Sequence, residues 1–116
     1  MIVQTVKLSK QGEIFLDIIN QVFEIERKAE KLQESNSIQR NLDKLKEMLE
    51  TQGLIYENPI GQNFDETRTD CNASIAGEST DNLVIVEVIK PIIRVKQNNM
   101  TQIIQKAVVV VQSQAQ

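Results

Sequence analysis

The residues with catalytic or metal-binding potential are few, and they lie in one acidic stretch. Asp65, Glu66 and Asp70 are close in sequence, and grouped carboxylates can bind a hard cation. Their spacing matches no established cation-binding loop, so an acidic surface loop is the simpler interpretation. The chain has no histidine, which excludes histidine-based acid–base catalysis and most transition-metal sites. We therefore expect a protein that is not an enzyme and uses no cofactor.

Cysteine content and charge narrow the functional classes further. Cys71 is the only cysteine, so it forms no internal disulfide, and we expect a buried or half-buried thiol. The net charge is −3, without the clustered Lys and Arg that a phosphate backbone requires. The longest apolar run, residues 107–111, is too short to cross a bilayer, and the start lacks a signal-peptide pattern. We expect a soluble cytoplasmic protein that binds neither nucleic acid nor membranes.

A helical region, residues 1–52, is the first of the elements that must position any binding surface. Apolar residues recur there every three or four positions, the rhythm of a coiled-coil seam, in two sets that are one residue out of phase. The Ser-Asn-Ser segment at 35–37 separates the sets, and such residues favour caps and turns. The pattern predicts helices at 13–34 and 37–52, either folded back as a hairpin or continuous with a kink. The predicted dimerisation residues are Phe15, Ile18, Val22, Ile25, Leu32, Leu42, Leu45 and Leu49.

Neither arrangement of the two helices covers this seam within one chain. Nothing after residue 52 is helical enough to pack on it, so a second copy of the chain is the simplest partner. We therefore expect a homodimer.

The remaining residues, 53–116, predict a small all-β domain. Gly53 suits the left-handed position that ends a helix. Pro91 cannot donate to a ladder and marks a bulge, an edge or a break, and residues 97–99 predict a turn because Asn tolerates positive φ. The β-prone segments are 54–57, 70–76, 83–89, 92–96 and 103–112. The sequence thus predicts an α+β chain, with an N-terminal helical coiled-coil dimerisation region followed by a small all-β domain.

Several motifs, taken in order, resemble the GrpE family of nucleotide exchange factors. A helix ending in Leu-Glu-x-x-Gly (49–53) precedes Pro-Ile-Gly-Gln-Asn-Phe-Asp (59–65), which is similar to the family's Gly-x-x-Phe-Asp-Pro motif. Val-Glu-Val-Ile (86–89) resembles its Val-x-x-Val-Leu segment, and residues 103–111 resemble its closing strand. Phe-Leu-Asp-Ile-Ile-Asn (15–20) is similar to the stretch that begins its helical bundle. The resemblance covers residues 15–111.

The chain departs from the family pattern at several positions. Glu66 stands where the family has Pro after Phe-Asp, Pro91 interrupts its Lys-Gly-Tyr turn, and Gln102 stands where an Arg precedes the final strand. We also expect the family's long N-terminal helix to be absent, because 12 residues precede Glu13. The dimer bundle and the β domain are thus expected to be kept, and the chaperone contact to have diverged.

The resemblance implies a co-chaperone that acts in protein folding and the stress response without catalytic groups. A GrpE-like dimer presents its β domain to the ATPase domain of a DnaK-type chaperone and holds the nucleotide cleft open, which promotes ADP release. The partner-binding residues that the resemblance implies are Phe64, Arg94, Gln102 and Lys106.

Other interpretations of the same residues stay open. Phe64 is large and apolar, so a core role is the simpler one, and Arg94 and Lys106 are equally compatible with a solubilising surface. A homodimeric coiled-coil adaptor with a different protein partner uses the same seam. A helical subunit of a phage or a secretion system also fits the pattern.

Overall fold

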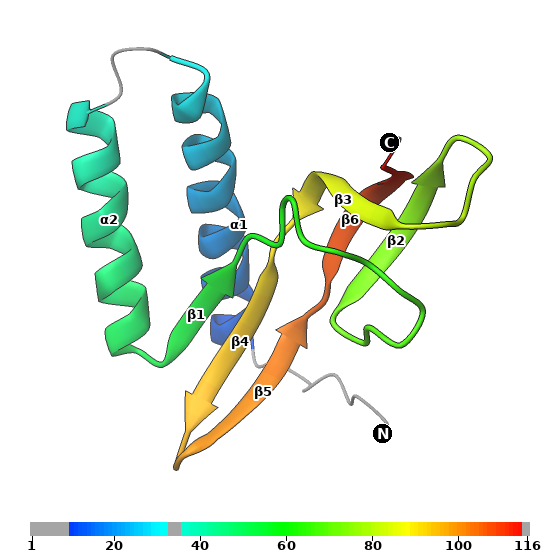
Figure 1. Ribbon diagram of the computed structural model, residues 1–116. Helices are drawn as coiled ribbons and strands as arrows, with labels where there is room; N and C mark the ends of the chain where they lie inside the picture. Colours follow the sequence, from blue (N-terminus) through cyan, green and yellow to red (C-terminus); the bar gives the residue numbers. More distant parts are fainter. Residues whose placement is uncertain (1–9, 33–35, 115–116) are drawn as a thin grey trace.

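The computed structural model describes residues 10–32 and 36–114 of the 116-residue chain. Two helices, α1 (Lys10–Glu30) and α2 (Asn36–Thr51), form an antiparallel hairpin that precedes the strands (Figure 1). The strands in this part of the chain are β1 (Leu54–Glu57), β2 (Cys71–Ala76), β3 (Leu83–Lys90), β4 (Ile92–Gln97), β5 (Met100–Gln105) and β6 (Ala107–Ser113). The predicted α+β class is therefore confirmed. Of the two predicted arrangements of the helices, the structure has the hairpin and not the continuous kinked helix.

The strands form two small sheets instead of one. Sheet A has the order β1-β4-β5 and is antiparallel throughout. Sheet B has the order β2-β6-β3, with β2 parallel and β3 antiparallel to β6. The chain passes from sheet B to sheet A at Pro91, between β3 and β4. Pro91 is thus a break between ladders, where a missing N–H costs nothing.

The prediction of one closing strand at 103–112 is wrong. The structure divides this segment at Lys106 into β5, which belongs to sheet A, and β6, which belongs to sheet B. The apolar run continues across the division, and hydrophobicity alone does not record a change of neighbouring strand. The run of valines is buried or paired as expected, because β6 is the central strand of sheet B.

Helix α2 ends at Thr51, and Gly53 has the left-handed conformation that was predicted for the residue that follows the helix. The φ of Gly53 is +80°, and its amide donates to the carbonyl of Glu50 at 2.8 Å. A Cβ at this position would lie 2.7 Å from the carbonyl oxygen of Lys96. The Lys96 amide donates to the Gly53 carbonyl at 2.8 Å, so this glycine lets β4 approach the end of the helix. Asn98 and Asn99 also have positive φ, 51° and 65°, which confirms the predicted turn between β4 and β5.

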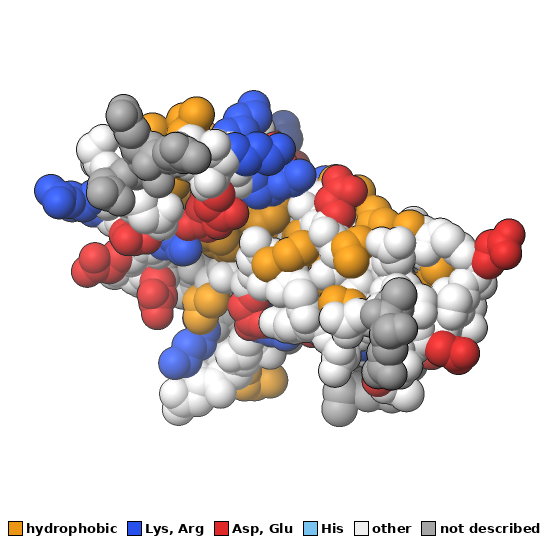
Figure 2. All heavy atoms as spheres, turned by 45° about the horizontal axis from the view of Figure 1, so that its top comes forward, with side chains coloured by type: hydrophobic (Ala, Val, Ile, Leu, Met, Phe, Trp, Pro, Cys, Tyr) orange, Lys and Arg blue, Asp and Glu red, His pale blue; other side chains and the backbone are white. Residues whose placement is uncertain are grey.

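The core forms around α1, which packs against α2 and against both sheets. Ile19 packs with Ile93 and Ile104 of sheet A, and Phe23 packs into the core of sheet B. A third cluster joins α1 to Leu42 of α2. Some hydrophobic side chains stay visible along the junction of the hairpin with the β domain (Figure 2). None of the described helices is long and apolar enough to cross a membrane.

Candidate functional site

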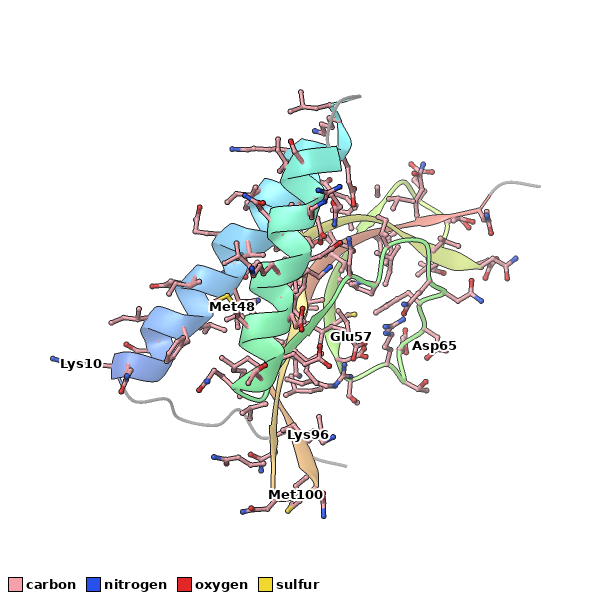
Figure 3. All side chains as sticks on the ribbon, turned by 90° about the vertical axis from the view of Figure 1, so that its left-hand side faces the viewer. Lys10, Met48, Glu57, Asp65, Lys96 and Met100 are labelled. Carbon is pink, nitrogen blue, oxygen red and sulfur yellow. The ribbon has the colours of Figure 1, made fainter. Side chains whose placement is uncertain are left out.

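The outer face of the helical hairpin carries an apolar groove of about 520 Å³. Phe15 and Ile18 line it from α1, and Leu45 and Met48 line it from α2. Their exposed fractions run from 36% for Phe15 to 59% for Met48, and none of the described residues that line the groove is charged. Met48 lies over the space between the two helices in Figure 3. A contiguous exposed apolar surface of this kind is typical of a protein-binding site.

The groove follows from the way that α1 divides its apolar residues among several neighbours. Ile19 and Phe23 face the sheets, and Val22 packs with α2. Ile18 and Ile25 are seven positions apart and stay exposed on α1, and Leu32 is exposed just beyond the helix end. A seven-residue interval keeps two side chains on one helix face, so an apolar stripe of Ile18 and Ile25 extends from the groove along α1.

The eight predicted dimerisation residues divide between the interior of the hairpin and its surface. Val22 and Leu42 are buried in the cluster that joins the two helices, and Leu49 is half-buried beside them. The predicted residues that stay exposed are Phe15, Ile18, Ile25, Leu32 and Leu45. Met48 was not predicted, although it lies three residues after Leu45, a spacing that places both on the same side of a helix.

A polar cluster ties the hairpin to β1. The Glu26 carboxylate accepts hydrogen bonds from Tyr56 Oη at 3.0 Å, Lys46 Nζ at 3.1 Å and Gln39 Nε2 at 3.2 Å. Lys46 Nζ also lies 5.2 Å from the centre of the Tyr56 ring, a favourable cation–π geometry. The residues that meet at Glu26 are between 13 and 30 positions away from it, so no local spacing rule predicts them.

The electrostatics of this cluster keep Glu26 ionised. Burial raises the pKa of Glu26, but the hydrogen bonds from Gln39, Lys46 and Tyr56 outweigh it, so the pKa lies below its ordinary value of 4.5. Burial and the hydrogen bond to Glu26 both raise the pKa of Tyr56. At neutral pH a carboxylate therefore joins α1, α2 and β1 through charge-assisted bonds.

The acidic stretch does not gather into a cation site. Arg68 Nε donates to Asp70 at 2.6 Å, and Arg94 Nη2 lies 3.7 Å from the other oxygen of Asp70. Burial raises the pKa of Asp70, but the Arg68 hydrogen bond and charge outweigh it and lower the pKa. Asp65 instead accepts the backbone N–H of Thr67 at 2.8 Å. In residues 10–32 and 36–114, no group of three or more His, Cys, Asp or Glu is placed to hold a metal ion.

Cys71 is buried at the start of β2, as the sequence predicts. Burial, with the adjacent Asp70 charge, raises the pKa of its thiol to about 11. The thiol is therefore protonated at neutral pH and is a poor nucleophile.

Two of the partner-binding residues implied by the resemblance lie on opposite faces of sheet A. Arg94 is paired with Ile103, and Val95 is paired with Gln102. Paired residues share a sheet face and successive residues alternate, so Arg94 and Gln102 point in opposite directions. Gln102 is exposed, whereas Arg94 is half-buried and forms an ion pair with Glu57 as well as with Asp70.

The other two residues of this set lie elsewhere in the β domain. Phe64 is half-buried and packs against the core of sheet B. Lys106 is half-buried at the point where the chain leaves β5 for β6. The structure therefore does not bring the four implied residues together.

No protein-family model, curated protein or solved structure in the comparisons matches the chain.

Proposed function

We propose that this chain is a homodimeric nucleotide exchange factor of the GrpE type, which binds the ATPase domain of a DnaK-type chaperone and promotes ADP release. The observation that carries the proposal is the helical hairpin with its exposed apolar groove. The hairpin continues through Gly53 into a two-sheet β domain, which is the order of elements that the resemblance implies. Such a factor needs no catalytic group, because a partner shifts an equilibrium through its different affinities for two states.

The dimer in this proposal forms through the groove and the stripe on α1. Two copies that present the same face to each other make an isologous contact, and two helical hairpins in such a contact form a four-helix bundle. The contact removes Phe15, Ile18 and Met48, all exposed in one chain, from water. Burial of apolar area of this kind is the main driving force for association.

The chaperone contact in this proposal belongs to the β domain. Of the two implied residues with a charge, Arg94 is held by ion pairs and Lys106 forms none in the described part of the chain. Arg94 is a poor test position, because its replacement breaks the ion pairs with Glu57 and Asp70. Charge reversal at Lys106 therefore tests the contact with less risk to the fold.

The experiment measures the release of a fluorescent ADP analogue from a DnaK-type chaperone of the same organism, with and without the protein. The proposal is supported if the protein accelerates ADP release, and if this acceleration is smaller with the Lys106→Glu variant but unchanged with the Lys28→Glu variant. Lys28 is an exposed position on α1, so the second variant has the same charge change away from the β domain. Absence of both acceleration and binding in a parallel titration would refute the exchange function.

A homodimeric coiled-coil adaptor with a different protein partner is the second candidate. The separation of Arg94, Gln102 and Phe64 favours it, because these residues do not form one continuous contact surface. A dimer in solution that does not bind the chaperone would support the adaptor over the exchange factor.

A further inference from the structure

Among the described residues, strand β2 is an open edge of sheet B. Within residues 10–32 and 36–114 it pairs with β6 alone, and Figure 1 shows it at the side of the β domain away from the hairpin. Its six residues, Cys-Asn-Ala-Ser-Ile-Ala, include no charge and no proline. Its register with β6 runs from Cys71 to Ala76 without a bulge. Charges, prolines and bulges are the usual protection of an exposed edge against further strands, and β2 has none of them.

The other edge strand of the same sheet is protected. Strand β3 has two register shifts along its pairing with β6, and Pro91 follows its last residue. The loop that precedes β2 in the sequence also covers the first half of β3. The Gly61 amide donates to the Ile85 carbonyl at 2.8 Å, and the Phe64 amide donates to the Leu83 carbonyl at 2.9 Å. By contrast, β2 is the edge of sheet B that lacks such protection among the described residues.

The direction of the free backbone groups on β2 follows from one hydrogen bond. The Ala107 amide donates to the Asp70 carbonyl at 3.0 Å, and Cys71 is the parallel partner of Ala107. In a parallel ladder the backbone groups of alternate residues point to the same side. The amides and carbonyls of Cys71, Ala73 and Ile75 therefore point away from β6, toward the open edge.

A hollow of about 670 Å³ adjoins the end of β2. Its apolar lining consists of Phe64, Ile75 and Leu83. Its charged lining is entirely acidic among the described residues and consists of Asp65, Glu66 and Asp81. Ile75 is paired with Val111, whose side chain belongs to the core of sheet B, so the hollow opens on the inner face of the sheet. Figure 2 shows acidic side chains at this end of the molecule.

We propose that the edge of β2 binds an extended segment of a partner protein, which joins sheet B as a fourth strand. Main-chain hydrogen bonds to Ala73 and its neighbours supply affinity, and side chains that enter the hollow supply specificity. The apolar lining fits branched aliphatic side chains, and the three carboxylates fit a Lys or Arg at the end of the segment. This site is separate from the groove of the hairpin and from the proposed exchange activity.

The test adds the peptide acetyl-Lys-Thr-Val-Thr-Val-Thr-Lys-amide to the full chain labelled with ¹⁵N. Its valines and lysines share one face of a strand, so they reach the inner face of sheet B in either direction of pairing. Amides that point outward exchange readily in the free protein, and we expect the exchange of Ala73 to slow about tenfold or more at about 1 mM peptide. Exchange at Ser74, whose amide points to β6, should change little.

Two control peptides separate backbone pairing from charge. A peptide N-methylated at the central Thr and at the following Val keeps the same charge and side chains but lacks a donor toward β2 in either direction of pairing, and we expect it not to protect Ala73. A peptide with Glu at both ends can pair but meets the acidic lining, and we expect weaker protection. Equal effects of all three peptides, or no protection of Ala73 by the first, would overturn the proposal.

Variants at Ala73 test the same edge from the side of the protein. Ala73→Pro removes the outward amide and no bond to β6, so we expect it to abolish peptide binding, whereas Ala73→Ser keeps the amide and the binding. If Ala73→Pro does not fold, Ala73→Lys replaces it, since a cation on the edge repels the lysine peptide. Protection of Ala73 that grows with protein concentration without peptide would identify a second copy as the occupant and overturn the proposal.

Discussion

Replacement of Ile18 with Ala should weaken the proposed dimer about 30-fold. Ile18 lines the groove of the hairpin and is 42% exposed, so a second copy can bury that fraction of its side chain. The change removes three carbon atoms, each worth about 0.8 kcal/mol when fully buried. At this exposure the loss is about 1 kcal/mol per copy, and it occurs twice in an isologous dimer. A loss of about 2 kcal/mol corresponds to the stated change in Kd.

Sedimentation equilibrium over a series of protein concentrations measures this Kd directly. Ala has a higher helix propensity than Ile, so weaker association of the variant would not reflect loss of α1. Ile89→Ala is the matched control, because Ile89 is 44% exposed on β3 and does not line the groove. We expect Ile89→Ala to leave Kd unchanged, and urea unfolding of each variant under monomeric conditions to show that the fold is intact.

Two results would refute this reasoning. Equal Kd values for Ile18→Ala and the unchanged chain would mean that the groove is not the contact between copies. Equal weakening by Ile18→Ala and Ile89→Ala would mean that association depends on apolar surface in general and not on the hairpin.

The remaining predictions concern stability and are measured by urea unfolding. Gly53→Ala should lower the free energy of unfolding by about 2–3 kcal/mol, because the new Cβ would lie 2.7 Å from the Lys96 carbonyl oxygen and φ is +80°. Gly77→Ala is the control: its φ is +87° with open space around it, so the loss should be about 1 kcal/mol. Equal losses for the two variants would contradict the steric explanation. Tyr56→Phe should cost about 1–2 kcal/mol through loss of the 3.0 Å hydrogen bond to Glu26. The lowered pKa of Glu26 means that the folded chain binds fewer protons there than the unfolded chain, so its stabilising effect is present above pH 4.5 and is lost as the pH falls below that value. Glu26→Gln should flatten this part of the stability–pH curve, and an unchanged slope would show that Glu26 does not cause it.

The parts of the fold that the sequence predicts well are governed by local rules. Gly53 has the positive φ that a helix end requires, and Asn98 and Asn99 have the positive φ of the turn. Strand β1 has the predicted bounds, Leu54–Glu57. Each of these features depends on the conformational preference of one or two residues, which the sequence states directly.

The division of the strands between two sheets depends on contacts between residues far apart in the sequence, which local patterns do not predict. Residues 103–112 read as one strand, yet β5 pairs with β4 and β6 lies between β2 and β3. A central strand and an edge strand of similar apolar content look alike in sequence. Of the break predicted at 35–37, Ser35 lies outside the described residues, whereas Asn36 and Ser37 begin α2. The hairpin is therefore known from the packing of α1 on α2.

The sequence predicts an apolar seam on the helices but not which of its residues stay exposed, and Phe23 explains the difference. The seam spacing gave equal weight to Val22 and Ile18, because a helical pattern does not say which side faces the β domain. Phe23 is fully buried in the core of sheet B and makes an edge contact with Tyr56, with ring centres 6.2 Å apart. This contact fixes the rotation of α1 about its axis and thus which face of α1 meets α2. On that face Val22 is buried against α2, and Ile18, one turn earlier, lines the groove and stays exposed. The surface that α1 offers to a partner is therefore set by how the helix packs on the β domain.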